Sequence, residues 1–172
     1  MKGSHDVFME LPSWEYRNAV TASMLNPALM AVVLAGAAES FEFHSGKMMP
    51  FEYSFLIAPL VLHRESRDAL PSRIDSHMTK WVLDHPVLTA GLPARAQEIA
   101  PYVREGLRFG LNNKALRLRP DGTMSGQIKS SPRTLKRNND LSSIVRGSGF
   151  VGRWLTTAPS SAAVYSLFGV TP

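Results

Sequence analysis

Basic side chains gather in one short part of this chain, where they could bind phosphate groups or the carboxylates of an acidic protein. Between residues 117 and 137 there are six basic residues and one acid, Asp121, so this segment carries a charge of +5. The basic residues are Arg117, Arg119, Lys129, Arg133, Lys136 and Arg137. The whole chain also carries +5, so the basic excess is local. Three interpretations remain open: contact with nucleic-acid phosphates, contact with an acidic protein, or an ordinary solvated surface.

The residues around the first two arginines predict a β-hairpin. Apolar and basic residues alternate over 116–119, and Pro120-Asp121-Gly122 has the composition of a tight turn. The predicted core-facing positions are Leu116, Leu118, Met124, Gly126 and Ile128. We therefore expect Arg117 and Arg119 to project from the face opposite the core, and residues 129–137 to form a basic loop.

A second pattern, formed by Gly147, Gly149 and Gly152, matches the G-x-G-x-x-G fingerprint of dinucleotide-binding proteins. That fingerprint requires a preceding strand and an acid about 20 residues later, which binds the ribose. No Asp or Glu follows Gly152. The glycines therefore predict close packing of a helix near Trp154, which we expect either to be buried there or to fill a pocket of a partner.

Neither catalysis nor cofactor binding is indicated by the remaining residues. The five histidines, His5, His44, His63, His77 and His85, never occur at i, i+4 spacing. The chain has no cysteine, which excludes disulfides and thiolate metal sites, and it has no phosphate-binding P-loop and no nucleophile elbow. We therefore expect no catalytic residue, no metal and no cofactor.

The composition favours a cytoplasmic protein outside the membrane. Asp6, Glu10 and Glu15 occupy the region where a signal peptide would need an apolar core. The longest apolar run, residues 27–38, has 12 residues, whereas a membrane span needs about 20. An absence of cysteine is also compatible with a reducing compartment.

Periodicity predicts one domain over residues 1–172, mainly α with one short β-hairpin, which is an α+β fold. Residues 1–17 are expected to be a mobile arm whose Trp14 and Tyr16 dock onto the body. The predicted helices are one that Asn26 and Pro27 begin, one carrying Phe51, Phe55 and Leu62, one covering 72–84, and C-terminal helices within 138–170. Residues 93–113 are expected to form either one kinked helix or two short ones, because Pro101 divides them. Residues 72–130 have the order of a winged-helix-like portion, with 101–113 in the position of the recognition helix.

Several short motifs, in this order along the chain, resemble the middle component of bacterial three-component ABC systems (ABC-3C, Lamassu-like). They are Leu25-Asn26-Pro27-Ala28, Met49-Pro50-Phe51, Pro59-Leu60-Val61-Leu62-His63, Leu70-Pro71, Phe150-Val151-Gly152-Arg153-Trp154 and Phe168-Gly169-Val170-Thr171-Pro172. Such systems are associated with defence against phages and plasmids, and their genes stand beside an ABC or SMC-like ATPase and a variable effector.

The resemblance implies a non-catalytic adaptor in a DNA-associated ATPase complex. Its expected partners are an ABC/SMC-like ATPase subunit and an effector subunit such as a nuclease, with DNA reached through the complex and no membrane. Phe150, Arg153 and Trp154 are the positions predicted to form the partner interface. A free-standing winged-helix DNA-binding regulator is the alternative, and a small enzyme is a third hypothesis.

Overall fold

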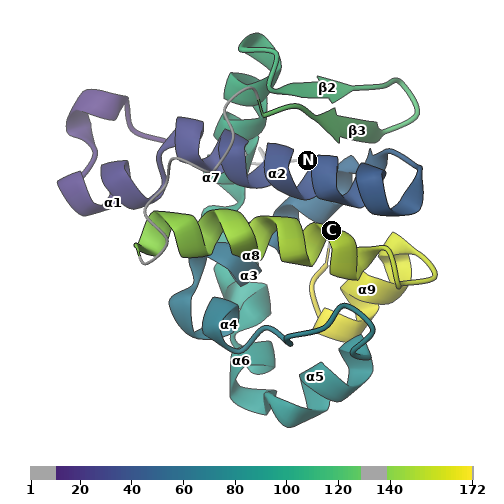
Figure 1. Cartoon of the computed structure of the whole chain (residues 1–172). Helices are drawn as coiled ribbons and strands as arrows, with labels where there is room; N and C mark the ends of the chain where they lie inside the picture. Colours follow the sequence, from purple (N-terminus) through teal and green to yellow (C-terminus); the bar gives the residue numbers. More distant parts are fainter. Residues whose placement is uncertain (1–10, 129–138, 172) are drawn as a thin grey trace, which may run out of the picture.

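Helix α2, Pro27–Ser45, lies at the centre of the fold in the computed structural model, which describes residues 11–128 and 139–171 (Figure 1). The predicted start is confirmed, because the Asn26 side chain accepts a hydrogen bond from the Ala28 amide at 2.7 Å and Pro27 follows it. The helix ends at Gly46, whose φ of 70° is the left-handed conformation that favours glycine. Most of the α2 side chains between Met30 and Ala38 are buried, so this helix forms the middle of the core.

The stretch Ala19–Ser45 is long and apolar enough to cross a membrane, judged by length and composition alone. It is divided in the structure into α1, Ala19–Met24, and α2, with Asn26 capping the second helix. The side chains between Met30 and Ala38 are mostly buried in the protein core, whereas Val20 and Met24 of α1 are exposed, and 33% of the apolar window is buried.

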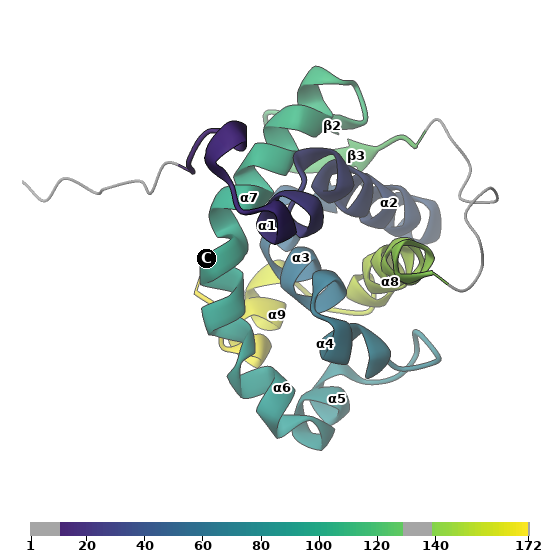
Figure 2. The same ribbon diagram turned by 90° about the vertical axis from the view of Figure 1, so that its left-hand side faces the viewer.

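Two long helices and one short helix surround α2. α8 (Asp140–Leu155) runs beside it, α7 (Leu92–Asn112) crosses it, and α3 (Ser54–Leu62) packs against both α7 and α8 (Figure 2). The shorter elements are η1 (Trp14–Tyr16), η2 (Phe51–Tyr53), α4 (Arg64–Asp68), α5 (Met78–Asp84), α6 (Pro86–Ala90) and α9 (Ser161–Phe168). α7 runs unbroken through Pro101, so the single helix is the correct one of the two predicted alternatives.

The predicted hairpin consists of β2 (Leu116–Leu118) and β3 (Thr123–Gly126). Leu118 pairs with Met124 across it, and the turn between them contains Gly122 with a φ of 77°. The structure therefore confirms the α+β fold class. Leu116 and Met124 are buried as predicted, and Leu116 packs against Gly110 of α7, whereas Leu118 on the same strand is 48% exposed.

A third strand, β1 (Met49–Pro50), joins this sheet and pairs antiparallel with β3, which gives the strand order β1-β3-β2. The sequence predicts only the two strands of the hairpin, so this third strand is an addition to the predicted fold. A strand of two residues has no periodicity of its own, and its conformation depends on pairing with a distant segment.

The N-terminal arm docks by a different residue from those predicted. Within the described part of the arm, Trp14 and Tyr16 are exposed, Tyr16 at 82%. Arg17 makes the contact instead: its guanidinium donates two hydrogen bonds to the Glu105 carboxylate on α7, at 2.7 and 2.8 Å. Only 4% of the Arg17 side chain remains exposed. Residues 1–10 lie outside the described part of the chain.

The helix predicted for residues 72–84 begins only at Met78. The residues before it form a turn, in which the Ser76 amide donates to the Arg73 carbonyl at 3.3 Å. The Ser76 carbonyl accepts the indole N–H of Trp154 at 2.7 Å, so this turn is attached to α8.

Candidate interaction surfaces

The arginines of the hairpin make no salt bridge with any other described residue. Arg117 and Arg119 are exposed, and neither side chain makes an ion pair or a hydrogen bond within residues 11–128 and 139–171. The turn beside them is held by Asp121, which accepts hydrogen bonds from the Thr123 hydroxyl and amide at 2.6 and 3.0 Å. These hydrogen bonds lower the pKa of Asp121, so the turn retains one negative charge at neutral pH. The predicted contacts Lys129, Arg133, Lys136 and Arg137 lie outside the described residues.

One side of the hairpin also faces acidic residues. A shallow hollow between the sheet and α2 is lined by Glu39, Glu42 and Arg117. A phosphate approaching Arg117 from this side would meet two carboxylates of the same protein. Arg119 does not line this hollow, so the two arginines differ in their surroundings.

The three glycines of the G-x-G-x-x-G pattern lie in the middle of α8, where they allow neighbouring elements to approach closely. A Cβ atom added to Gly152 would lie 2.2 Å from the Ala37 carbonyl oxygen of α2. One added to Gly149 would lie 3.0 Å from the Ser40 hydroxyl, and one added to Gly147 would lie 3.2 Å from the Arg67 side chain. The packing role predicted for these glycines is therefore confirmed.

Trp154 lies inside the protein with 0% of its surface exposed. Its indole N–H donates to the Ser76 carbonyl, and its ring meets the Trp81 ring edge-on with centres 5.9 Å apart. Burial is therefore the correct one of its two predicted roles, and its assignment to a partner interface is corrected, because no partner reaches it without opening the core. Phe150 and Arg153 are partly exposed, so their assignment stays a prediction.

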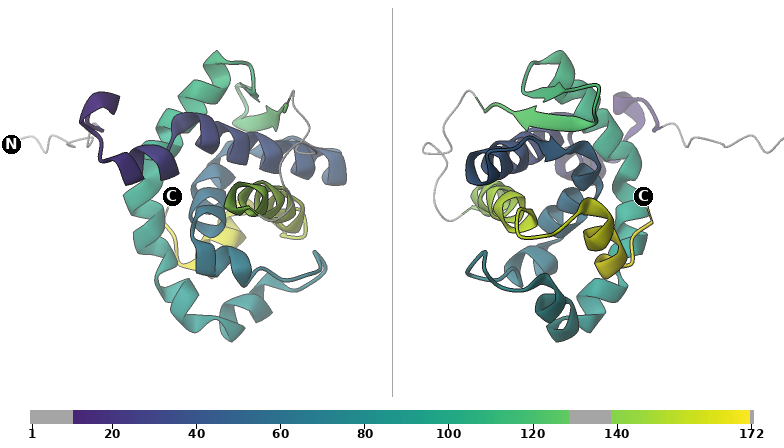
Figure 3. Two further views of the ribbon diagram at one scale, coloured as in Figure 1. Left: turned by 60° about the vertical axis from the view of Figure 1, so that its left-hand side comes forward. Right: turned by 90° about the vertical axis from the view of Figure 1, so that its right-hand side faces the viewer.

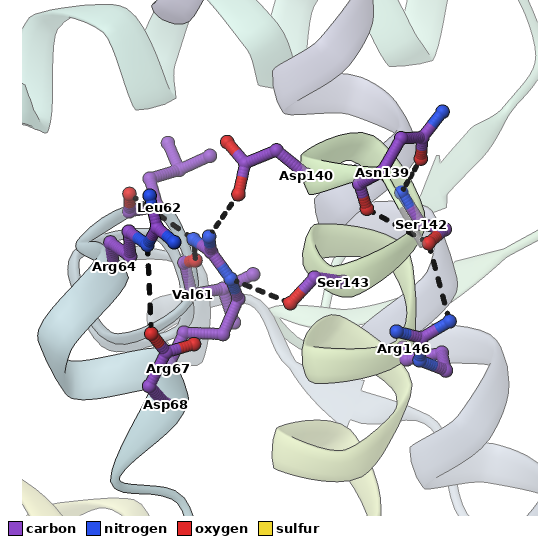
Figure 4. A network of polar contacts seen from close by, with 10 residues as sticks. All are labelled: Val61, Leu62, Arg64, Arg67, Asp68, Asn139, Asp140, Ser142, Ser143 and Arg146. Carbon is purple, nitrogen blue, oxygen red and sulfur yellow. Dashed lines mark hydrogen bonds and ion pairs between the residues drawn. The ribbon is translucent and has the colours of Figure 1, made fainter. Parts of the chain in front are cut away.

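A buried arginine that the sequence did not indicate connects α3 and α4 to the first turn of α8 (Figure 4). Arg67 follows α3 on α4, and only 4% of its side chain is exposed. It donates to the Val61 carbonyl at 2.7 Å, to the Ser143 hydroxyl at 3.1 Å and to the Asp140 carboxylate. These contacts fix the first turn of α8 against the end of α3. A lone arginine in a polar stretch carries no sequence signal for this role.

His63 and Ser66 have the distance of a base and a nucleophile, with 2.9 Å between Nδ1 and the hydroxyl oxygen. Ser66 is completely buried, however, and its hydroxyl also accepts a hydrogen bond from Arg95 at 3.3 Å. His63 Nδ1 accepts the Ser66 amide N–H, which caps α4. Burial, and then the Arg95 charge, lower the pKa of His63, which favours the neutral ring that this cap requires. The arrangement therefore stabilises local structure.

In Figure 3, α9 and the residues that follow it lie beside α7, and a pocket of about 670 Å³ is found between them. Apolar side chains supply most of its walls, among them Phe51, Phe55, Ala96, Ala100, Tyr165 and Val170. Arg104 stands at the pocket with its guanidinium 5.8 Å from the centre of the Phe55 ring. No sequence motif could indicate this pocket, because its walls come from three distant segments.

The described residues contain no group of three or more His, Cys, Asp or Glu side chains that could hold a metal ion. In comparisons with known proteins, the family model for "ABC-three component (ABC-3C) system Middle Component 3" matches residues 14–172. No curated protein matches the chain, and no solved structure matches it. The family match covers the hairpin, the α8 glycines and the pocket, so all three belong to the matched region.

Proposed function

The chain belongs to the Middle Component 3 family of ABC-three component systems, and we propose that it is the non-catalytic adaptor that links the ATPase subunit of such a system to an effector. Family membership makes the chain an accessory subunit of a multi-component defence system. The family match over residues 14–172 is the observation that carries the proposal.

The internal contacts of the polar groups support a role without catalysis. Arg67 is held by contacts to α3 and α8, and His63 caps α4 by accepting the amide N–H of the buried Ser66. In contrast, the exposed features, which are the hairpin arginines and the pocket beside α7, are of kinds that bind other macromolecules. We propose that the chain performs this adaptor function in the cytoplasm, where a DNA-associated ATPase acts.

Reconstitution tests the adaptor role. The full chain, its ATPase and its effector would be co-expressed from one system, with an affinity tag on the ATPase. We expect the effector to co-purify with the ATPase only when this chain is present. Recovery of an ATPase–effector complex of equal stability without the chain would contradict the proposal, as would a chain that associates with neither subunit.

The arrangement of the sheet favours a second candidate, a winged-helix DNA-binding regulator. From α2 to β3 the chain runs helix, strand, helices, strand and strand, and the strand order is β1-β3-β2. Winged-helix domains share this order, with α7 in the position of the recognition helix and the hairpin as the wing. The portion compared begins at α2, and so includes β1, which lies before the predicted boundary at residue 72.

DNA binding by the isolated chain distinguishes the two candidates. A regulator reads base edges and binds its operator with a Kd of about 10⁻⁸ M or tighter at physiological salt. The adaptor is expected to show only weak binding that is independent of sequence. Fluorescence anisotropy with the promoter region of the system and a scrambled duplex of equal length measures both, and a strong preference for the promoter would favour the regulator.

A further inference from the structure

The pocket beside α7 has mainly apolar walls, and two of its polar residues, Glu52 and Tyr165, make hydrogen bonds within the protein. The Glu52 carboxylate accepts a hydrogen bond from the Ser161 hydroxyl at 2.6 Å, and the Tyr165 hydroxyl donates to the Glu52 carbonyl at 2.5 Å. Burial raises the pKa of Tyr165, so this hydroxyl stays protonated as a donor. The volume of about 670 Å³ lies within the range of sites that bind ligands or anchor side chains.

Arg104 brings to the pocket a positive charge that pairs with no acid among the described residues. Arg104 is exposed and makes no salt bridge or side-chain hydrogen bond within the described ranges 11–128 and 139–171, and Arg108, one helical turn later, also makes none. The nearest acid in sequence, Glu105, is occupied by both guanidinium nitrogens of Arg17. Arg104 is held over the Phe55 ring, which positions its charge at the opening.

We propose that this pocket binds a short acidic segment of a partner subunit. One apolar or aromatic side chain of that segment fills the space between Phe55, Ala100 and Val170, and an adjacent carboxylate pairs with Arg104. Arg stacked on an aromatic ring is suited to holding a carboxylate at an interface, and buried apolar anchors supply most interface energy. This inference rests on the adaptor function, which requires such partners.

A protein segment fits this site better than nucleic acid does. The walls are mainly aliphatic and aromatic, which suits an apolar side chain of a protein and not a sugar–phosphate backbone. Two neighbouring cations, Arg104 and Arg108, match one or two carboxylates, whereas DNA-binding surfaces neutralise several phosphates in a row. The charge and the shape therefore both indicate an acidic peptide with an apolar anchor.

The test uses the complex of the full chain with the ATPase and effector of its own system. A photo-crosslinking amino acid replaces Gln97, an exposed residue of the pocket wall, and mass spectrometry identifies the segment that it captures. We expect one segment of a partner subunit that combines Asp or Glu with an apolar or aromatic residue. Three outcomes in an assembled complex would overturn the inference and leave the adaptor role intact. The crosslinker at position 97 could capture DNA, it could capture a segment without such residues, or it could capture nothing.

Matched variants measure the contribution of the charge. Arg104→Glu is expected to weaken the complex at least about tenfold, because it replaces attraction by repulsion at the opening. Gln97→Glu changes shape very little and is expected to act in the same direction more weakly. The control is Arg64→Glu, which reverses an arginine with 82% of its side chain exposed on α4. If circular dichroism shows both variants to be folded, equal affinity of the Arg104 and Arg64 variants for the partners would overturn the inference. If the wild-type chain forms no complex at all, the adaptor role is overturned as well.

Discussion

Helix α8 and the β2–β3 hairpin are the two regions whose sequences suggested chemistry, and they use their distinctive residues in opposite ways. In α8, Gly149 and Gly152 pack against α2, and the Trp154 ring packs against the Trp81 ring. In the hairpin Arg117 and Arg119 reach solvent and make no salt bridge with described residues. The residues of α8 are thus accounted for by packing inside the protein. The charges of the hairpin arginines are unpaired, so this surface remains available for binding.

Removing the Trp154 side chain is expected to have the largest effect on this comparison. Trp154→Ala should lower the free energy of unfolding by about 3–5 kcal/mol, because it empties a fully buried site and removes the donor to the Ser76 carbonyl. Urea denaturation followed by circular dichroism measures the change. Trp154→Phe keeps most of the ring and should cost less, so equal losses for both variants would show that ring volume is not the cause.

The second effect concerns the close approach of α8 to α2. Gly152→Ala should destabilise the protein by about 2–3 kcal/mol, because its Cβ would meet the Ala37 backbone at 2.2 Å and the backbone cannot rotate away. Gly149→Ala is the matched control in the same helix. Its Cβ would meet the Ser40 hydroxyl, which can rotate, and alanine gains about 1 kcal/mol of helix propensity over glycine.

Unfolding midpoints of the two glycine variants under identical conditions provide the measurement. If Gly149→Ala destabilises the protein as much as Gly152→Ala does, the tight contact with the α2 backbone is not what requires glycine in α8. A loss confined to Gly152→Ala would instead locate the requirement at the crossing of these two helices.

Local signals in the sequence predicted the parts of the fold that depend on neighbouring residues. Asn26 and Pro27 begin α2, and Pro120-Asp121-Gly122 forms the turn of the hairpin, because caps and turns are governed by a few adjacent residues. The glycine pattern of α8 was also interpreted correctly, since the sequence after it lacks the acid that dinucleotide binding requires.

The features that escaped prediction depend on residues far apart in the chain. Arg17 and Glu105 are separated by 88 positions, and Arg67 and Asp140 by 73. Neither pair has a spacing that marks it, because any exposed acid and base are equally plausible partners before the fold is known. The pocket is of the same kind, since its walls come from residues 51–55, 93–104 and 165–171, which meet only after the chain has folded.

The smallest effect on stability is expected for the hairpin, where function should change instead. Reversing Arg117 and Arg119 to Glu should alter the free energy of unfolding by no more than about 0.5 kcal/mol, because exposed side chains outside a network contribute little. A larger loss would mean that the hairpin arginines stabilise the sheet. The two arginines would then serve the stability of the fold, as the glycines of α8 do.

If the hairpin contacts DNA in the assembled complex, each arginine that neutralises a phosphate contributes about −0.9 to the slope of log K against log salt. The double reversal should therefore flatten that slope by about 1.8, and adding Arg133→Glu, Lys136→Glu and Arg137→Glu should flatten it further. Reversal of Arg64 and Arg73 is the matched control, because both are exposed and the change in net charge is the same. A slope unaltered in an intact complex would assign DNA contact to the other subunits. Failure of the hairpin variant alone to assemble would assign this surface to an acidic protein partner.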